Sequence, residues 1–133
     1  MPRATGTFDV KLAPQPSDDY ADGGMLGRLT IDKQFRGDLT GASKGQMLSA
    51  GTPVKGSAGY VAMELVTGTL AGRSGTFVFQ HSGTMNRGAA SLSLTVVPDS
   101  GSAELTGLTG AMLIDIANGK HSYVFEYALP DET

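Results

Sequence analysis

The stretch that decides the fold reads YVAMELVTGTLAGRSGTFVFQHSG and runs from Tyr60 to Gly83. It holds two extended, largely apolar runs on either side of a glycine-rich turn signal. A glycine in the first central position suits a type II′ turn, so Gly72-Arg73 is the predicted turn of an antiparallel hairpin. The rest of the chain can be laid out from this hairpin.

Two titratable residues of the hairpin occupy positions where valine or isoleucine would serve a strand equally well. Counting back from Gly72-Arg73 pairs Glu64 with His81, and Val66 with Phe79. Residues directly opposite each other have Cβ atoms about 5 Å apart. We therefore expect the carboxyl group and the imidazole to be direct cross-strand neighbours.

The next turn indicates which way these two side chains point. A two-residue turn at Arg87-Gly88 places Leu94 beside His81, and the opposite face of the same strands collects serine and threonine. Because one face is apolar and the other polar, the apolar face should be the buried one. The imidazole and its acidic neighbour should consequently point inward, whereas a slip of one residue would reverse them.

The turn signal at Asn118-Gly119 is the strongest in the chain, because both central residues of a type I′ turn need a positive φ. It pairs Ile114 with Tyr123 and Met112 with Phe125 on one apolar face. The other face is polar, as a half-buried hairpin requires.

Turn signals divide the chain into eight extended segments, and no window shows the apolar period of a helix. Antiparallel strands with one apolar face each can close into a barrel, which removes exposed edges. The predicted fold is therefore all-β: one domain over residues 1–133, an eight-stranded antiparallel β-barrel that is filled by side chains or holds one small ligand. The segments are 5–13, 28–36, 38–50, 57–71, 73–86, 88–98, 110–117 and 120–129.

Composition argues against several classes of protein. The net charge is −3 without a basic block, which speaks against nucleic acid as a partner. No run approaches membrane-spanning length, and the first residues lack the apolar core of a signal peptide, so we expect a cytoplasmic protein that binds no membrane.

The chain has no cysteine, its two histidines make no zinc site, and Asp18, Asp19 and Asp22 lack the spacing of a calcium loop. Neither a metal nor a cofactor is predicted.

Four segments carry a resemblance to a known family: TGTFDVK, LVTGTLAGRSGTFVFQHSGTM, SLTVVPDSGSAELTGLTG and GKHSYVFEYAL. Together they resemble a bacterial domain-of-unknown-function family with an allene oxide cyclase-like barrel, over nearly the whole chain. The resemblance implies an oligomeric eight-stranded antiparallel barrel. The wider group includes plant allene oxide cyclases and bacterial cyclases that form rings in polyketides, and these enzymes shape a flexible apolar substrate inside the lumen. No catalytic residue of theirs is matched to this chain.

Glu64 and His81 are the candidate catalytic residues. Burial would raise the pKa of a lone glutamate and lower that of a lone histidine, whereas each partner favours the charged form of the other. Such coupled groups often mark functional sites. The alternative is a satisfied buried pair that fixes strand register.

Seven aromatic or aliphatic residues on the predicted inward face are the candidate substrate-binding residues. The tyrosine hydroxyls among them can bind a ligand carbonyl or a backbone group at the barrel end. His121, beside the last turn, either guards an entrance or is a partly exposed turn residue. The seven are Tyr60, Phe77, Phe79, Leu94, Tyr123, Phe125 and Tyr127.

Three functions fit these residues. The first is an isomerase or cyclase that holds an apolar substrate in the lumen, with Glu64 and His81 moving a proton. The second is a non-catalytic carrier or sensor for a hydrophobic metabolite. The third is a structural oligomer whose lumen is packed solid. Val61, Met63 and Leu65 face outward if Glu64 faces in, so their apolar strip predicts a homodimer or a larger assembly.

Overall fold

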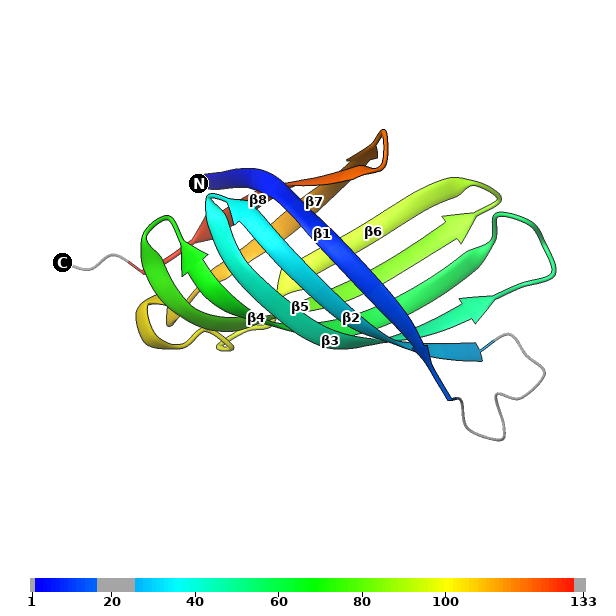
Figure 1. Ribbon diagram of the computed structural model, residues 1–133, viewed down its shortest axis with the longest axis horizontal. Helices are drawn as coiled ribbons and strands as arrows, with labels where there is room; N and C mark the ends of the chain where they lie inside the picture. The colour runs from blue at the N-terminus through cyan, green and yellow to red at the C-terminus, as the bar shows by residue number, and fades with distance from the viewer. Residues whose placement is uncertain (1, 17–25, 131–133) are drawn as a thin grey trace.

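The computed structural model describes residues 2–16 and 26–130, in which eight antiparallel strands form a closed barrel in chain order (Figure 1). The predicted all-β barrel is therefore confirmed. Each strand ends within a few residues of the bounds expected from the turn signals. The strands are β1 (Arg3–Gln15), β2 (Leu26–Gly37), β3 (Leu39–Gly51), β4 (Ala58–Leu70), β5 (Arg73–Asn86), β6 (Ala89–Val96), β7 (Thr109–Ala117) and β8 (Lys120–Ala128).

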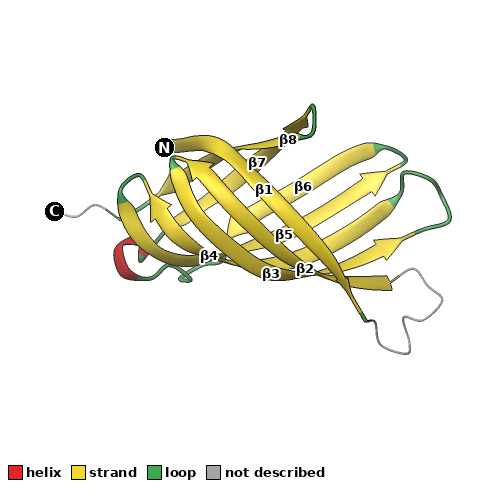
Figure 2. Cartoon of the chain, in the orientation of Figure 1, coloured by secondary structure: helices red, strands yellow, loops and turns green. Residues whose placement is uncertain are grey.

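The connection between β6 and β7 contains a short 3-10 helix, Ala103–Leu105, the red segment of Figure 2. Its residue Leu105 is fully buried against the end of the barrel. Among the described residues, no helix is both long and apolar enough to cross a membrane.

The hairpin of β4 and β5 corrects the predicted register. Leu70 pairs with Arg73, so the turn residues are Ala71 and Gly72, and Glu64 lies opposite Phe79 instead of His81. Both turn residues have positive φ, 49° and 85°. The sequence favoured a glycine in the first position because alanine rarely adopts this conformation.

Tertiary contact offsets the cost of this conformation: the Ala71 N–H donates a hydrogen bond of 3.0 Å to the carbonyl oxygen of Asp38, in the turn between β2 and β3. The error in register is two residues, which keeps every side chain on its predicted face. His81 now lies opposite Ala62 and diagonally from Glu64.

The other two predicted turns are confirmed. Asn86 pairs with Ala89 around Arg87-Gly88, and Leu94 lies opposite His81. The turn at Asn118-Gly119 pairs Ile114 with Tyr123 and Met112 with Phe125, as expected. Its residues have φ of 53° and 76°, which agrees with the type I′ geometry that the Asn-Gly pair indicated.

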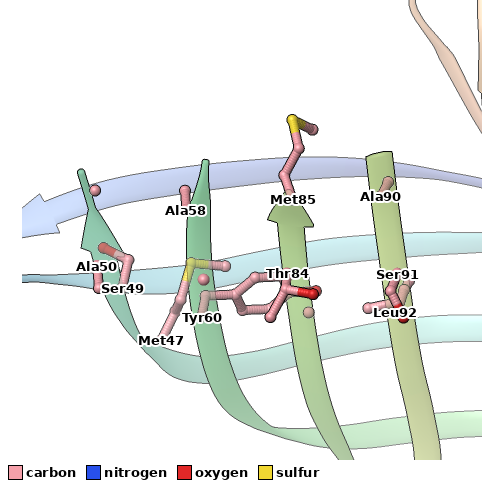
Figure 3. Close-up of a pocket in the computed structure, with 13 residues that line it drawn as sticks. Met47, Ser49, Ala50, Ala58, Tyr60, Thr84, Met85, Ala90, Ser91 and Leu92 are labelled. Atoms are coloured by element: carbon pink, nitrogen blue, oxygen red, sulfur yellow. The ribbon is translucent and has the colours of Figure 1, made fainter. Parts of the chain in front are cut away.

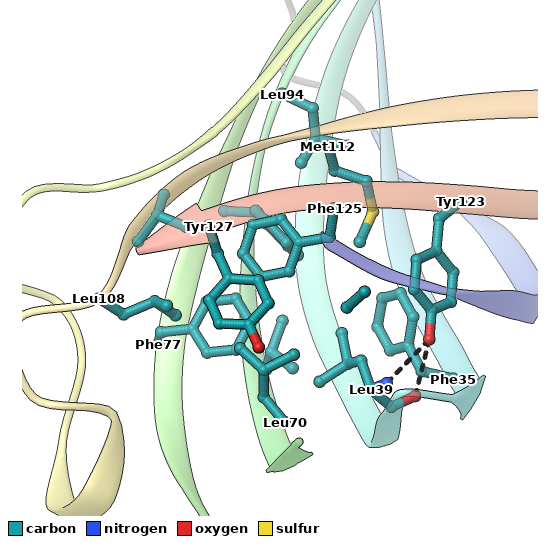
Figure 4. Packing of buried hydrophobic residues seen from close by; sticks show 14 of the residues in the cluster. Phe35, Leu39, Leu70, Phe77, Leu94, Leu108, Met112, Tyr123, Phe125 and Tyr127 are labelled. Atoms are coloured by element: carbon teal, nitrogen blue, oxygen red, sulfur yellow. Dashed lines mark hydrogen bonds between the residues drawn. The ribbon is translucent and has the colours of Figure 1, made fainter. Parts of the chain in front are cut away.

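One end of the barrel, called the closed end here, is filled by side chains (Figure 4). It carries the β4–β5 turn and the 3-10 helix. Three phenylalanines form its centre: Phe77 packs edge-on to Phe79 with ring centroids 5.0 Å apart, and Phe125 stacks on Phe77 at 6.1 Å. All three rings are fully buried.

Tyr123 ties three strands together at the closed end (Figure 4). Its hydroxyl lies 2.9 Å from the carbonyl oxygen of Arg36 and 3.0 Å from that of Leu39, and it accepts the Leu39 N–H at 3.0 Å. The hydroxyl reaches this position across Gly6, where an added Cβ would lie 2.5 Å from the tyrosine oxygen. The hydroxyl therefore makes its hydrogen bonds with backbone groups and is not available to a ligand in the lumen.

The opposite end, called the open end here, carries the Arg87-Gly88 turn and the loop between β3 and β4. β6 and β7 share one ladder pair among the described residues, Thr95 with Ala111, and diverge toward the open end (Figure 1). Apolar side chains on the lumen face of the strands consequently remain exposed there, among them Met85 and Leu92.

The Tyr123→Phe variant should lose about 1–3 kcal/mol of unfolding free energy, because the Leu39 N–H and two carbonyl oxygens lose their partner in a buried place. Urea unfolding measures the difference. Tyr127→Phe is the matched control, since the Tyr127 hydroxyl makes no hydrogen bond to a described residue and should change stability by less than about 0.5 kcal/mol. Equal losses in both variants would contradict this role of Tyr123.

Candidate functional site

Glu64 and His81 meet inside the barrel, as predicted from the sequence. The imidazole Nε2 lies 2.6 Å from Glu64 Oε1. Glu64 is 0% exposed and His81 4% exposed. The diagonal placement across β4 and β5 brings the two functional groups into hydrogen-bond contact, because their long side chains lean toward each other on one face.

Two further polar residues complete this cluster, and the sequence analysis missed both. Lys33 Nζ of β2 lies 3.1 Å from Glu64 Oε1, and Ser43 Oγ of β3 donates to Glu64 Oε2 at 2.5 Å. A signal for Lys33 was present, since it alternates with Ile31 and Phe35 on one face of its strand. Nothing in the pattern of β3 distinguished Ser43 from the other small residues around it.

Lys33 reaches the interior over aromatic rings. Its Nζ lies 4.8 Å from the ring centroid of Phe8 and 5.8 Å from that of Phe35. A cation above an aromatic face is attracted by the ring quadrupole. The lysine is only 5% exposed, so its charge is balanced inside the barrel by these rings and by Glu64.

Burial alone would raise the pKa of Glu64, but the opposing interactions are together stronger. The hydrogen bond from His81, the charge of Lys33 and the hydrogen bond from Ser43 hold the pKa of this carboxyl group below its usual range. Glu64 is therefore an ionised carboxylate at neutral pH whose two oxygens both accept hydrogen bonds. It has no proton to donate, which excludes it as a general acid in this state.

A cavity of about 480 Å³ lies in the mouth of the open end, between β3, β4, β5 and β6 (Figure 3). Its wall is formed mostly by apolar and small side chains, including Met47, Met85 and Leu92. A volume of this size falls in the range that holds small organic ligands.

Tyr60 connects the cavity with the buried cluster. It lines the cavity, and its ring meets the imidazole of His81 edge-on with centroids 6.2 Å apart. Its ring also lies over Gly83, where an added Cβ would be 2.5 Å from the tyrosine Cε1. Burial, and then the charge of Glu64, raise the pKa of the Tyr60 hydroxyl, so this group stays protonated.

The predicted substrate-binding residues divide between the two ends of the barrel. Of the seven, Tyr60 lines the cavity at the open end, and Tyr127 borders a smaller depression of about 300 Å³ at the closed end. The other five are buried in the core cluster and line neither: Phe77, Phe79, Leu94, Tyr123 and Phe125.

The remaining sequence candidates lie outside the lumen site. His121 lies on the inward face of β8, opposite Ile116, and packs against Phe8 with ring centroids 5.1 Å apart, but it does not line the cavity at the open end. Val61, Met63 and Leu65 are exposed on the outer face of β4, as expected, and their binding of a second copy stays a prediction. Asp18, Asp19 and Asp22 lie outside the described residues. Within the described ranges, no group of three or more histidine, aspartate or glutamate residues could hold a metal ion.

Comparison with known proteins identifies the family of the chain. Residues 4–127 match the model described as "Protein of unknown function (DUF3224)". The chain belongs to the DUF3224 family. A crystal structure of a DUF3224 protein of unknown function from Shewanella oneidensis MR-1 is 53% identical, covers 98% of each chain and superposes with a TM-score of 0.93. A search of curated proteins found no match.

Membership of the DUF3224 family confirms the resemblance to a bacterial family of unknown function that the four segments indicated. The likeness to allene oxide cyclases stays a prediction. Membership of this family implies no particular activity, because a shared fold does not determine function.

Because the pKa of Glu64 is lowered, part of the unfolding free energy of the protein should be lost at acid pH. A group with a lowered pKa in the folded state adds stability above its unfolded pKa, near 4.5, and this contribution is lost as the pH falls toward the folded pKa. The unfolding free energy should therefore decline below about pH 4.5 more steeply in the native protein than in Glu64→Gln, in urea titrations at several pH values.

Asp115→Asn is the control for this experiment, because Asp115 is exposed on the outer face of β7. It should leave the acid slope unchanged. Parallel slopes for the native protein and Glu64→Gln would contradict the ionised state of the buried carboxylate.

Proposed function

We propose that this protein binds an apolar small molecule in the open end of its barrel. The observation that carries the proposal is the exposure of apolar side chains that face the lumen. Leu12 is 46% exposed, Met85 43%, Leu92 41% and Ile116 63%. Each alternates along its strand with outward residues and shares a face with buried core residues nearer the closed end.

When no ligand is bound, this exposed apolar surface lowers the stability of the folded protein. Apolar surface left in water costs roughly 25 cal/mol per Å², and the chain has already buried the equivalent positions at the closed end. A contiguous exposed apolar surface in a concave place typically marks a binding site. An apolar ligand that enters the cavity would cover Met85 and Leu92 together.

Binding can be tested with diphenylhexatriene, an uncharged probe whose fluorescence rises when it leaves water. Leu92→Asp should weaken probe binding by about tenfold or more, because a carboxylate in the apolar wall has to lose its hydration when the probe binds. Fluorescence titration at neutral pH measures the dissociation constant.

The matched control is Leu113→Asp, which changes an equally apolar residue that is exposed on the outer face of β7. This variant should bind the probe as the native protein does. Failure of the native protein to bind diphenylhexatriene, or equal losses in both variants, would refute the proposed site.

A second candidate function, an isomerase or cyclase, is favoured by one observation: Glu64 orients the imidazole of His81 through a hydrogen bond of 2.6 Å. A carboxylate that fixes an imidazole beside an apolar cavity is a recurring arrangement for a general base. A base of this kind can move a proton within one substrate, which needs no cofactor.

The candidate base can be tested with 5-nitrobenzisoxazole, an apolar aromatic compound whose ring opens to a coloured phenolate when a base removes one C–H proton. The native protein should accelerate this opening, and His81→Asn should reduce the rate by about a hundredfold while retaining diphenylhexatriene binding. Equal rates in both proteins would refute the role of His81 as a base, and only the proposed binding function would remain.

A further inference from the structure

Two hydroxyl groups on the inward face lie in the wall of the open-end cavity. Ser49 of β3 and Tyr60 of β4 are direct cross-strand neighbours, and both line the cavity. Neither hydroxyl makes a hydrogen bond to a described residue. In the described part of the chain, no fully buried side-chain oxygen or nitrogen lacks a hydrogen-bond partner, so both hydroxyls have to reach open space.

The two hydroxyls point to different parts of the wall. Ser49 Oγ lies toward β2, where an added Cβ at Gly27 would be 3.1 Å from it. The ring of Tyr60 extends from β4 over β5 toward β6, with its oxygen at the far end (Figure 3). It crosses Gly83, and Leu92 lies opposite this glycine on β6. The Tyr60 hydroxyl is therefore directed toward an apolar part of the wall.

The wall offers a ligand no charge. Among the described residues that line the cavity, none is an aspartate, glutamate, lysine, arginine or histidine. A charged group of a ligand would lose its hydration there without gaining an ion pair. Burial, and then the charge of Glu64, raise the pKa of the Tyr60 hydroxyl, so a negative charge is disfavoured beside it.

From this geometry we propose that the ligand is a neutral apolar molecule with a carbonyl group, such as a ketone or an ester, and that its carbonyl oxygen accepts a hydrogen bond from the Tyr60 hydroxyl. The inference rests on the proposed binding function and names the class of its ligand. A hydrocarbon that displaces water from the cavity would leave the O–H donor without a partner, which reduces affinity. A carbonyl oxygen replaces that water and adds no charge.

Three compounds with a benzene ring and a short alkyl chain test the ligand class. Hexanophenone and hexylbenzene differ by a carbonyl group in place of one CH₂ group, and 4-pentylbenzoate carries a carboxylate. Each compound is titrated against diphenylhexatriene bound to the native protein. Hexanophenone should displace the probe at least about tenfold more effectively than 4-pentylbenzoate, because only the carboxylate has to bury a charge.

The Tyr60→Phe variant keeps the ring and removes the donor. Because hexylbenzene leaves water more readily than the ketone, the measured quantity is the ratio of the two affinities in each protein. This ratio should shift against the ketone by about tenfold in Tyr60→Phe. Tyr127→Phe is the matched control, since it removes a hydroxyl at the closed end and should leave the ratio unchanged.

A second measurement needs no variant. A hydrogen bond to the carbonyl oxygen weakens the C=O bond, so the infrared stretching band of hexanophenone should lie at lower frequency in the native complex than in hexane. The same band should return toward its position in hexane when the ketone is bound to Tyr60→Phe. The unfolding transition of this variant verifies that it is folded.

The outcomes separate the two proposals. An unchanged affinity ratio in Tyr60→Phe, a band at its position in hexane, or stronger binding of 4-pentylbenzoate than of the ketone would overturn the carbonyl inference. Failure of hexanophenone to displace bound diphenylhexatriene would do the same, and each of these results leaves apolar binding intact. Absence of binding by all three compounds and by diphenylhexatriene would overturn the binding function itself, together with the inference.

Discussion

The buried carboxylate of Glu64 is the constraint on which the lumen depends. An ionised group with no exposed surface has lost its hydration, and only hydrogen bonds and opposite charge can replace that loss. The replacements come from three other strands: Lys33 from β2, Ser43 from β3 and His81 from β5. One carboxylate therefore relates four consecutive strands to one another, since a shift of any of them would leave a charge or a donor unpaired.

This cluster lies between two halves of the lumen with different properties. Toward the closed end, aromatic rings such as Phe77 and Phe125 are fully buried and pack against one another. β6 and β7 share only one ladder pair in the described part of the chain, Thr95 with Ala111, and they diverge toward the open end, where apolar side chains on the lumen face stay exposed. One half of the lumen is thus filled by buried side chains, and the other half contains the cavity.

The sequence predicted the polar pair better than it predicted the cavity. Alternation along β5 and β6 placed His81 on the apolar face, and this face survived a register error of two residues because side chains alternate with a period of two. The aromatic residues Phe77, Phe79 and Phe125 were also placed correctly on the inward face, but an inward position does not distinguish a packed core from a ligand-binding wall. Met47 and Met85, which do line the cavity, carried no signal in the one-dimensional pattern.

The sequence by itself determined the eight strands, their antiparallel order, two of the three tight turns and the direction of Glu64 and His81. These properties follow from local rules: turn residues with positive φ and an apolar period of two. Only the tertiary structure decided the turn at Ala71, the recruitment of Lys33 and Ser43, and the division of the lumen into a filled and an open half. The physical reason is that these depend on groups far apart in the chain, which meet only when the barrel closes.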